Sequence, residues 1–243
     1  MNILKANRTT YGGWIQTGSV SVVEIMAITG KFDWMCIDLE HGIMSSVESL
    51  TNMIITMELH DVLPVVRVPK NDHKWIGRAL DAGAKGIIVP MVNSKKDAQM
   101  AVDSVKYPPH GKRGFGYSRS NGFGCNFKKS IEIHDIALIV QIEHEQAMQN
   151  LTEILTVNGV DGSLIGPLDL KGSIDINMDN TIFNRWIDSY LATCKKLGSP
   201  AGIHIVEPNI SDIKRAENSG YRTIAIGTDA VLLRQRMENL LCN

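Results

Sequence analysis

Two carboxylates and an amide follow two apolar segments in a pattern that could hold a divalent cation. The apolar run at residues 137–142 contains Gln141 and precedes Glu143, and a second run further along leads through Gly-Pro to Asp169. The residues between the runs carry apolar side chains at helical spacing, which predicts strand, helix and strand. Such a unit places both strand ends at one edge of a parallel sheet. Oxygen ligands gathered there suit a hard cation, although either acid alone could equally cap a helix or pair in a loop.

A histidine and an arginine also stand where predicted strands end. His41 follows Asp38 by three positions, and a carboxylate that accepts from one imidazole nitrogen raises the basicity of the other. The alternative is a capping Asp38 beside a solvent-facing His41. Arg67 ends another apolar segment, where a buried guanidinium must meet an anion. That anion could be a bound enolate, or a carboxylate at the rim such as Glu40 or Glu143.

Strand-like and helix-like segments alternate along the chain. We expect strands at 14–17, 32–37, 63–68, 86–89, 137–142, 162–165, 201–206 and 223–226. We expect helices at 22–29, 45–59, 72–81, 94–105, 145–157, 180–197, 210–219 and 230–241, with irregular segments at 107–129 and 171–180. This alternation, without a GxGxxG motif, predicts an α/β fold: a closed parallel (β/α)8 TIM barrel forming a single domain over residues 1–243.

In such a barrel the polar residues at the strand ends face one common mouth. The predicted mouth residues are Gln16, Asp38, Glu40, His41, Arg67, Gln141, Glu143, Asp169, Glu207, Thr228 and Asp229. None of the predicted strands ends in a lysine, so a Schiff-base mechanism is not indicated.

The composition excludes several classes of partner. With 44% hydrophobic and 21% charged residues and a formal net charge of −1, the chain has no basic block for nucleic acid or an anionic membrane. The N-terminal segment lacks the apolar core of a secretory signal, and no apolar run approaches the ~20 residues of a membrane span. The four cysteines are scattered without a CxxC pair, which favours reduced thiols and a cytoplasmic location.

Several ordered motifs give the chain a resemblance to the HpcH/HpaI aldolase family, the metal-dependent class II pyruvate aldolases. The first is Glu24 with Phe32-Asp33-Trp34 and Ile37-Asp38-Leu39-Glu40-His41-Gly42. The others are Val66-Arg67-Val68-Pro69, Leu80-Asp81-Ala82-Gly83-Ala84, Val89-Pro90-Met91-Val92, Tyr107-Pro108-Pro109 with Gly111-Lys112-Arg113-Gly114, Gln141-Ile142-Glu143, and Gly159-Val160-Asp161 with Ile165-Gly166-Pro167-Leu168-Asp169-Leu170. Together they span most of the chain.

The resemblance implies a site and a reaction. Glu143 and Asp169 would bind Mg²⁺, Mn²⁺ or a similar ion, with Gln141 close by and the amides of Gly166 and Leu168 near the carboxylate of pyruvate. Arg67 would stabilise the enolate oxygen, and the pair of His41 and Asp38 would move the proton.

The implied activity is reversible aldol cleavage of a 4-hydroxy-2-oxo acid to pyruvate and an aldehyde. The family also implies a homo-oligomer, a hexamer or trimer of dimers. Asp81 matches a functional position of the family, but it lies at the end of a predicted helix and would reach a mouth only across a subunit boundary.

Two departures leave the substrate open. Lys171 stands where we expect a small hydroxyl residue, and the loop at 116–124 is irregular. Rival hypotheses are a citrate-lyase or malyl-CoA type lyase, a 2-oxo acid decarboxylase that uses the same enolate, and an inactive barrel that serves as a binding protein. A coenzyme A ester would call for a basic groove that the sequence does not plainly contain.

Overall fold

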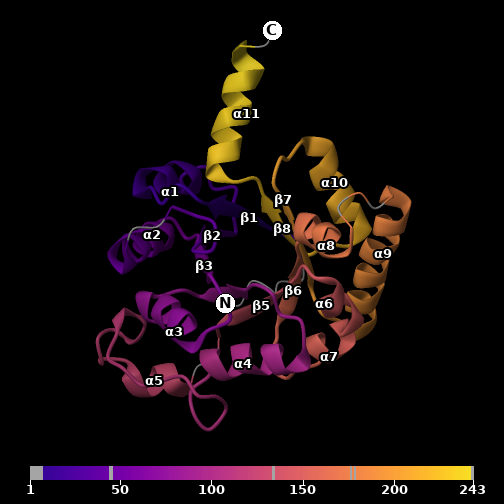
Figure 1. Ribbon diagram of the computed structural model, residues 1–243. Helices are drawn as coiled ribbons and strands as arrows, with labels where there is room; N and C mark the ends of the chain where they lie inside the picture. Colours follow the sequence, from indigo (N-terminus) through magenta and orange to yellow (C-terminus); the bar gives the residue numbers. More distant parts are fainter. Residues whose placement is uncertain (1–7, 44–45, 133–134, 176, 178, 242–243) are drawn as a thin grey trace.

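Eight parallel strands, joined in sequential order, close into a barrel in the computed structural model, which describes residues 8–43, 46–132, 135–175, 177 and 179–241 (Figure 1). The strands are β1 (Thr10–Ile15), β2 (Trp34–Asp38), β3 (Leu63–Arg67), β4 (Gly86–Val89), β5 (Ala137–Ile142), β6 (Gly162–Ile165), β7 (Ala201–Ile205) and β8 (Thr223–Ile226). Strand β1 pairs with both β2 and β8, which completes the closure. The predicted (β/α)8 barrel is therefore confirmed.

Helices follow the strands and surround the barrel. They are α1 (Val20–Ala27), α2 (Val47–Leu59), α3 (His73–Ala82), α4 (Lys95–Val105), α5 (Phe127–Glu132), α6 (Glu145–Gln149), α7 (Leu151–Leu155), α8 (Pro167–Ile174), α9 (Asn180–Leu197), α10 (Ile210–Ser219) and α11 (Asp229–Leu241), with a 3₁₀ turn, η2, at Arg119–Asn121. Ser19, Ser46, Asp72, Ser94 and Asn209 accept main-chain hydrogen bonds at the starts of their helices. These caps begin the helices after short loops that leave the strand ends.

The core has two layers. A large apolar layer lies between the strands and the helices, and a smaller cluster fills the inside of the barrel around Trp14 and Trp34. Gly12 makes room for this filling, because a Cβ atom there would lie 2.3 Å from the Trp34 ring. The interior is thus closed by side chains, as is typical of this barrel, and polar groups occupy the C-terminal ends of the strands.

Four segments differ from the predicted boundaries. Strand β1 starts at Thr10 rather than at Trp14. Gly12 and Gly13 have poor strand propensity, so the sequence did not indicate a strand there. A residue as small as glycine is nevertheless required at position 12, because the Trp34 ring lies against it. The predicted helix over 145–157 is divided into α6 and α7 at Asn150, whose side-chain amide donates to the Asn93 carbonyl (2.8 Å). Helices α5 and α8 both extend into segments predicted as irregular. The predicted start of the second helix at Ser45 lies outside the described residues.

Among the described residues, none of the helices combines the length and apolar composition that a membrane crossing requires. Cys36, Cys125 and Cys194 are free thiols. Cys242 lies outside the described part of the chain.

Candidate active site

The ends of β2 and β3 place a carboxylate and a guanidinium side by side. Asp38, the last residue of β2, is the direct register partner of Arg67, the last residue of β3. Because parallel strands end at the same edge, both side chains stand at one rim of the barrel. Arg67 Nε lies 2.9 Å from Asp38 Oδ1, and Arg67 Nη2 lies 2.7 Å from Asp38 Oδ2. The two groups form a bidentate ion pair.

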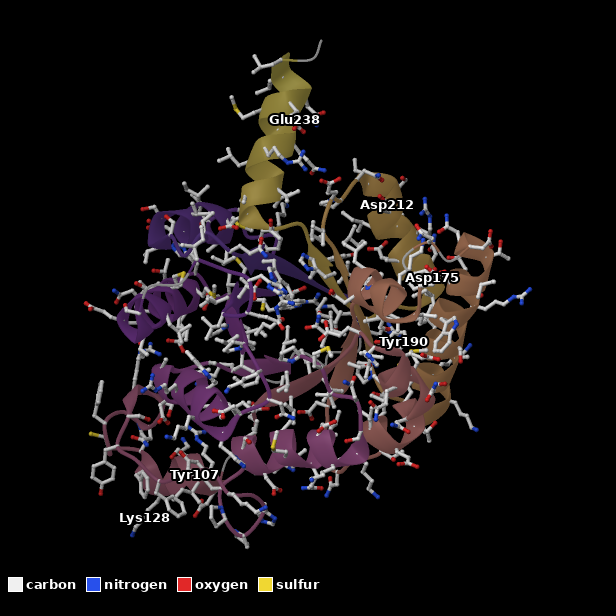
Figure 2. All side chains as sticks on the ribbon, in the orientation of Figure 1. Tyr107, Lys128, Asp175, Tyr190, Asp212 and Glu238 are labelled. Atoms are coloured by element: carbon white, nitrogen blue, oxygen red, sulfur yellow. The ribbon has the colours of Figure 1, made fainter. Side chains whose placement is uncertain are left out.

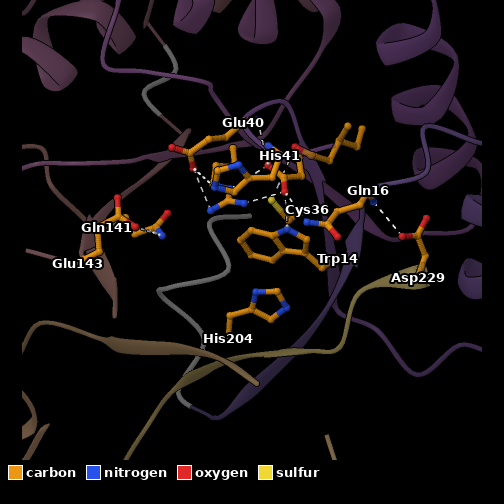
Figure 3. Close-up of polar contacts among 12 residues, drawn as sticks. Trp14, Gln16, Cys36, Glu40, His41, Gln141, Glu143, His204 and Asp229 are labelled. Atoms are coloured by element: carbon orange, nitrogen blue, oxygen red, sulfur yellow. Dashed lines mark hydrogen bonds and ion pairs between the residues drawn. The ribbon is translucent and has the colours of Figure 1, made fainter. Parts of the chain in front are cut away.

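Further partners surround this ion pair (Figure 3). Asp38 Oδ2 also accepts from Trp14 Nε1 at 3.2 Å and from Gln16 Nε2 at 3.1 Å. Its other oxygen accepts from the main-chain N–H of Glu40 at 3.0 Å. The Glu40 carboxylate itself lies 3.0 Å from Arg67 Nη1. Arg67 therefore pairs with two carboxylates, Asp38 and Glu40. The sequence had suggested Glu40 as a partner but not Asp38.

The ion pair determines the ionisation of Asp38. Burial opposes the charged form, but the hydrogen bonds and charge of Arg67, with the donors Gln16 and Trp14, outweigh burial and lower the pKa of Asp38 to about 2. Burial also disfavours the charged form of Arg67, yet Asp38 outweighs it and raises the pKa of Arg67. Both groups are charged at neutral pH, and the pair fixes the guanidinium in one orientation at the rim.

The predicted hydrogen bond between Asp38 and the His41 imidazole is replaced by a different contact. Asp38 Oδ1 accepts from the main-chain N–H of His41 at 3.3 Å, and the side chain of His41 is 63% exposed. The imidazole Nε2 lies 3.9 Å from a carboxylate oxygen of Glu40. Arg67 donates to both oxygens of Asp38, main-chain N–H groups also donate to Oδ1, and the Trp14 and Gln16 side chains also donate to Oδ2. This carboxylate therefore shapes the loop that carries His41 without a hydrogen bond to the ring.

A second carboxylate, Glu143, follows β5 and is only 5% exposed. Its Oε1 atom accepts from the main-chain N–H of Met91 at 2.7 Å, and its Oε2 atom accepts from the Gln141 side-chain amide. Met91 has a left-handed φ of 52°, a strained conformation for a residue other than glycine. The other amide atom, Gln141 Oε1, is buried without a hydrogen-bond partner.

Burial, together with nearby negative charge, makes Glu143 difficult to ionise. Burial, followed by the carboxylates of Glu40 and Asp169, raises the pKa of Glu143 to about 7, against the opposing effects of the Met91 N–H and Arg67. Burial likewise raises the pKa of Glu40, with Asp169 contributing in the same direction. Three acids thus interact at this rim, and Asp169 is one of them although it belongs to α8.

The residues at this rim fit a hard divalent cation that is bound partly by water or substrate. Among the described residues, no group of three or more His, Cys, Asp and Glu side chains is placed to hold a metal. Magnesium, however, usually keeps several waters and binds through one or two carboxylates. The unpartnered oxygen of Gln141 is a further neutral ligand of the right kind. Gly166 leaves this space open, since a Cβ atom there would lie 3.2 Å from Glu143 Oε2.

The segment after β6 is the first turn of α8 and not the loop predicted. Asp169 and Leu168 are both exposed there, and Pro167 occupies the first helical turn. The main-chain N–H of Gly166 donates to the Ile142 carbonyl at 3.0 Å, so it is not free for a ligand as predicted. No side chain caps the start of α8, so the main-chain amides of its first turn have no side-chain acceptor at the N-cap.

Asp81 is not brought to this rim within the chain. It lies in the last turn of α3, where its Oδ1 atom is 2.8 Å from Arg113 Nη2 and 3.3 Å from Ser118 Oγ. A helix that follows a strand returns to the opposite end of the barrel, which explains this position.

Other predicted mouth residues have local structural contacts. Asp229 accepts from the main-chain N–H groups of Gln16 and Thr17, Thr228 accepts from the Val231 N–H, and Glu207 pairs with Arg234. The sequence prediction missed Trp14, whose ring is covered by the Arg67 guanidinium with Cζ 5.0 Å from the ring centroid. It also gave no role to His204, whose ring stacks on Trp14 at 4.3 Å. The sequence did allow His204 to be a barrel-interior residue, and alternation along β1 could have indicated the same for Trp14.

Comparison with known proteins shows the family to which the chain is similar. The family model described as HpcH/HpaI aldolase/citrate lyase matches residues 10–235. A hydroxypyruvate/pyruvate aldolase of Roseobacter denitrificans is 34% identical over 237 residues, which cover 95% of this chain and 90% of that protein. A pyruvate aldolase of Rhizobium etli is 35% identical over 242 residues, covering 98% of this chain and 93% of that protein.

Solved structures show the same fold. The crystal structure of an HpcH/HpaI aldolase/citrate lyase family protein from Burkholderia cenocepacia J2315 superposes with a TM-score of 0.91 at 28% identity. That superposition covers 98% of this chain and 95% of the Burkholderia chain.

The lowered pKa of Asp38 predicts a pH-dependent contribution to stability. Because its folded pKa of about 2 lies below its ordinary value of 3.8, its contribution is complete above pH ~4 and is lost as pH falls toward 2. We expect Asp38→Asn to lower the free energy of unfolding at pH 7 by on the order of 2 kcal/mol. Urea unfolding followed by tryptophan fluorescence at pH 7, 5 and 3 measures this difference.

The matched control is Asp188→Asn, which changes an exposed carboxylate on α9 and should alter stability by less than about 0.5 kcal/mol. A destabilisation by Asp38→Asn that is the same at pH 3 as at pH 7 would show that the ionised pair is not its source.

Proposed function

Because the chain belongs to the HpcH/HpaI aldolase/citrate lyase family, we propose that it is a divalent-metal-dependent pyruvate aldolase. The reaction is reversible cleavage of the carbon–carbon bond of a 4-hydroxy-2-oxo acid to pyruvate and an aldehyde. The observation that carries the proposal is the environment of the buried Glu143. This carboxylate lies beside the unpartnered Gln141 oxygen and close to Asp169, and it has no ion-pair partner among the described residues.

Glu143 and Asp169 would hold the cation, with Gln141 Oε1 directed to the same space. The excess of carboxylates over cations at this rim supports the assignment, because acids placed together require a counter-charge. When bound, a divalent cation supplies positive charge beside the carboxylate and keto oxygens of pyruvate, where the charge of the enolate develops.

Arg67 would supply the second positive charge to the enolate oxygen. Its planar group is held by the two oxygens of Asp38 and by Glu40, so it needs no rearrangement when the charge forms. A donor fixed before the reaction stabilises the transition state more than one that must be ordered during it. Asp38 is therefore a positioning residue in this proposal, because it acts through Arg67.

His41 would take the proton of the 4-hydroxyl group during cleavage and return it during synthesis. The exposed ring, whose Nε2 lies 3.9 Å from a carboxylate oxygen of Glu40, supports this role, since an imidazole at the mouth can exchange a proton with a bound substrate. The amides at the start of α8, including that of Leu168, would meet the carboxylate of pyruvate.

We also propose that the protein is a homo-oligomer, a hexamer or trimer of dimers. Helix α11 projects away from the barrel, with Glu238 on its projecting part (Figures 1 and 2). An exposed apolar stripe runs along one face of this helix, made of Leu233, Met237, Leu240 and Leu241. A stripe at this spacing is typical of a helix that packs on a partner, and a second copy is the occupant we propose. In such an assembly Asp81 could serve the mouth of a neighbouring subunit.

The enolate chemistry predicts exchange of the pyruvate methyl protons. With Mn²⁺ or Mg²⁺ in D₂O, the protein should exchange these protons without any aldehyde, and ¹H NMR measures the rate. Glu143→Gln should lower the rate about 100-fold or more, since even outer-shell partners of a metal contribute ~10–100-fold. Exposed Glu153→Gln is the control and should match the wild type. Metal-supplemented protein that exchanges nothing would overturn the aldolase proposal.

The oligomer proposal predicts dissociation when α11 loses its apolar stripe. Leu233→Glu combined with Met237→Glu should place charge in the contact between copies and reduce the mass measured by light scattering after gel filtration. Gln235→Glu alters the opposite face of α11 and should leave the mass unchanged. A wild-type protein with the mass of one chain would contradict the proposal.

A further inference from the structure

His204 is a histidine inside the barrel for which the proposed reaction has no use so far. It lies one residue before the end of β7, and its ring stacks on Trp14 with centroids 4.3 Å apart and planes 18° from parallel (Figure 3). The Trp14 indole in turn donates to Asp38 and lies under the Arg67 guanidinium. His204 is therefore one ring away from the ion pair at the rim.

The hydrogen bonding of His204 fixes its tautomer. Nε2 lies 3.1 Å from the Gly227 main-chain carbonyl, which can only accept, so Nε2 carries the proton. Burial, with a contribution from the charge of Arg67, lowers the pKa of His204 to about 4, against the Gly227 hydrogen bond and the Asp38 charge. The ring is neutral at physiological pH, and Nδ1 carries a lone pair.

This lone pair is available to a ligand. Nδ1 has no hydrogen-bond partner among the described residues. It does not belong to the fully buried side-chain atoms without a partner. The residue as a whole is half-buried near the mouth. An acceptor held rigidly by a ring stack and a main-chain hydrogen bond costs little entropy to use in binding.

His204 does not belong to the strands that carry the proposed cation ligands. Glu143 and Asp169 follow β5 and β6, whereas His204 and Trp14 belong to β7 and β1. In Figure 3 the labelled side chains of Glu143 and Gln141 lie to one side of Trp14 and His204. If the oxo-acid end of a substrate is held at Glu143, an aldehyde end that extends toward β7 and β1 would meet His204.

We infer that His204 Nδ1 accepts a hydrogen bond from a hydroxyl group of the aldehyde partner, so that the enzyme selects hydroxylated aldehydes. The inference rests on the proposed aldolase function and assigns its substrate class. A neutral acceptor pairs with O–H and repels the lone pairs of a carboxylate. The carboxylates of Asp38 and Glu40, two acids beside the single guanidinium of Arg67, further disfavour an acidic aldehyde at this rim.

Two aldehydes that differ by a single hydroxyl group test the inference. Glycolaldehyde and acetaldehyde are each condensed with pyruvate in the presence of Mn²⁺, and the ratio of their kcat/KM values is compared between proteins. Comparison of ratios between variants cancels the difference in intrinsic reactivity of the two aldehydes. His204→Phe keeps a ring to stack on Trp14 but has no acceptor, and we expect the ratio to fall about ten-fold.

His204→Gln serves as the conservative variant, because its amide can donate toward Gly227 and still offer an oxygen. We expect it to retain most of the preference for glycolaldehyde. A wild-type ratio in His204→Phe, or equal losses in both variants, would overturn the assignment.

Pyruvate proton exchange in D₂O, measured on the same proteins without aldehyde, separates the two proposals. Exchange in the wild type together with an unchanged kcat/KM ratio in His204→Phe would reject aldehyde recognition by His204 but would still support the aldolase function. Absence of exchange in the wild type would reject both. Loss of exchange in His204→Phe would place the residue in the enolate chemistry, and would overturn its assignment to aldehyde recognition.

Discussion

A buried carboxylate that has no counter-ion among the described residues is the constraint on which the site depends. Glu143 is 5% exposed, and its pKa is raised to about 7 by burial and by neighbouring acids. Burying a charge without a partner is costly, so such a group persists where function requires it. On the other side of the rim, Arg67 is fully engaged by Asp38 and Glu40. Arg67 is thus paired within the protein, whereas Glu143 has no ion-pair partner among the described residues.

The barrel produces this division through strand register. Asp38 and Arg67 meet because they are register partners at the ends of β2 and β3. Glu143 and Gly166 meet because each follows one of two paired residues, Ile142 and Ile165, at the ends of β5 and β6. The inner cluster around Trp14 and Trp34 fills the barrel below them. The interior packing therefore supports the site, and the strand ends carry its chemistry.

Local sequence patterns predicted the fold and the rim but not the pairing across it. A polar residue directly after a buried apolar run must stand at a strand end, and this rule identified Asp38, Arg67 and Glu143. Which carboxylate meets Arg67 depends on the register between strands, which local sequence does not encode, so the imidazole of His41 was wrongly assigned to Asp38. The stack of Trp14 on His204 joins strands at opposite ends of the sequence and was missed for the same reason.

The most direct test of this account is to locate a bound cation. Crystals of the protein grown with Mn²⁺ would show the ion by its anomalous scattering. The account predicts one ion at the rim, with carboxylate oxygens of both Glu143 and Asp169 within about 2.5 Å of it. An ion bound elsewhere, or one coordinated by neither carboxylate, would contradict the account.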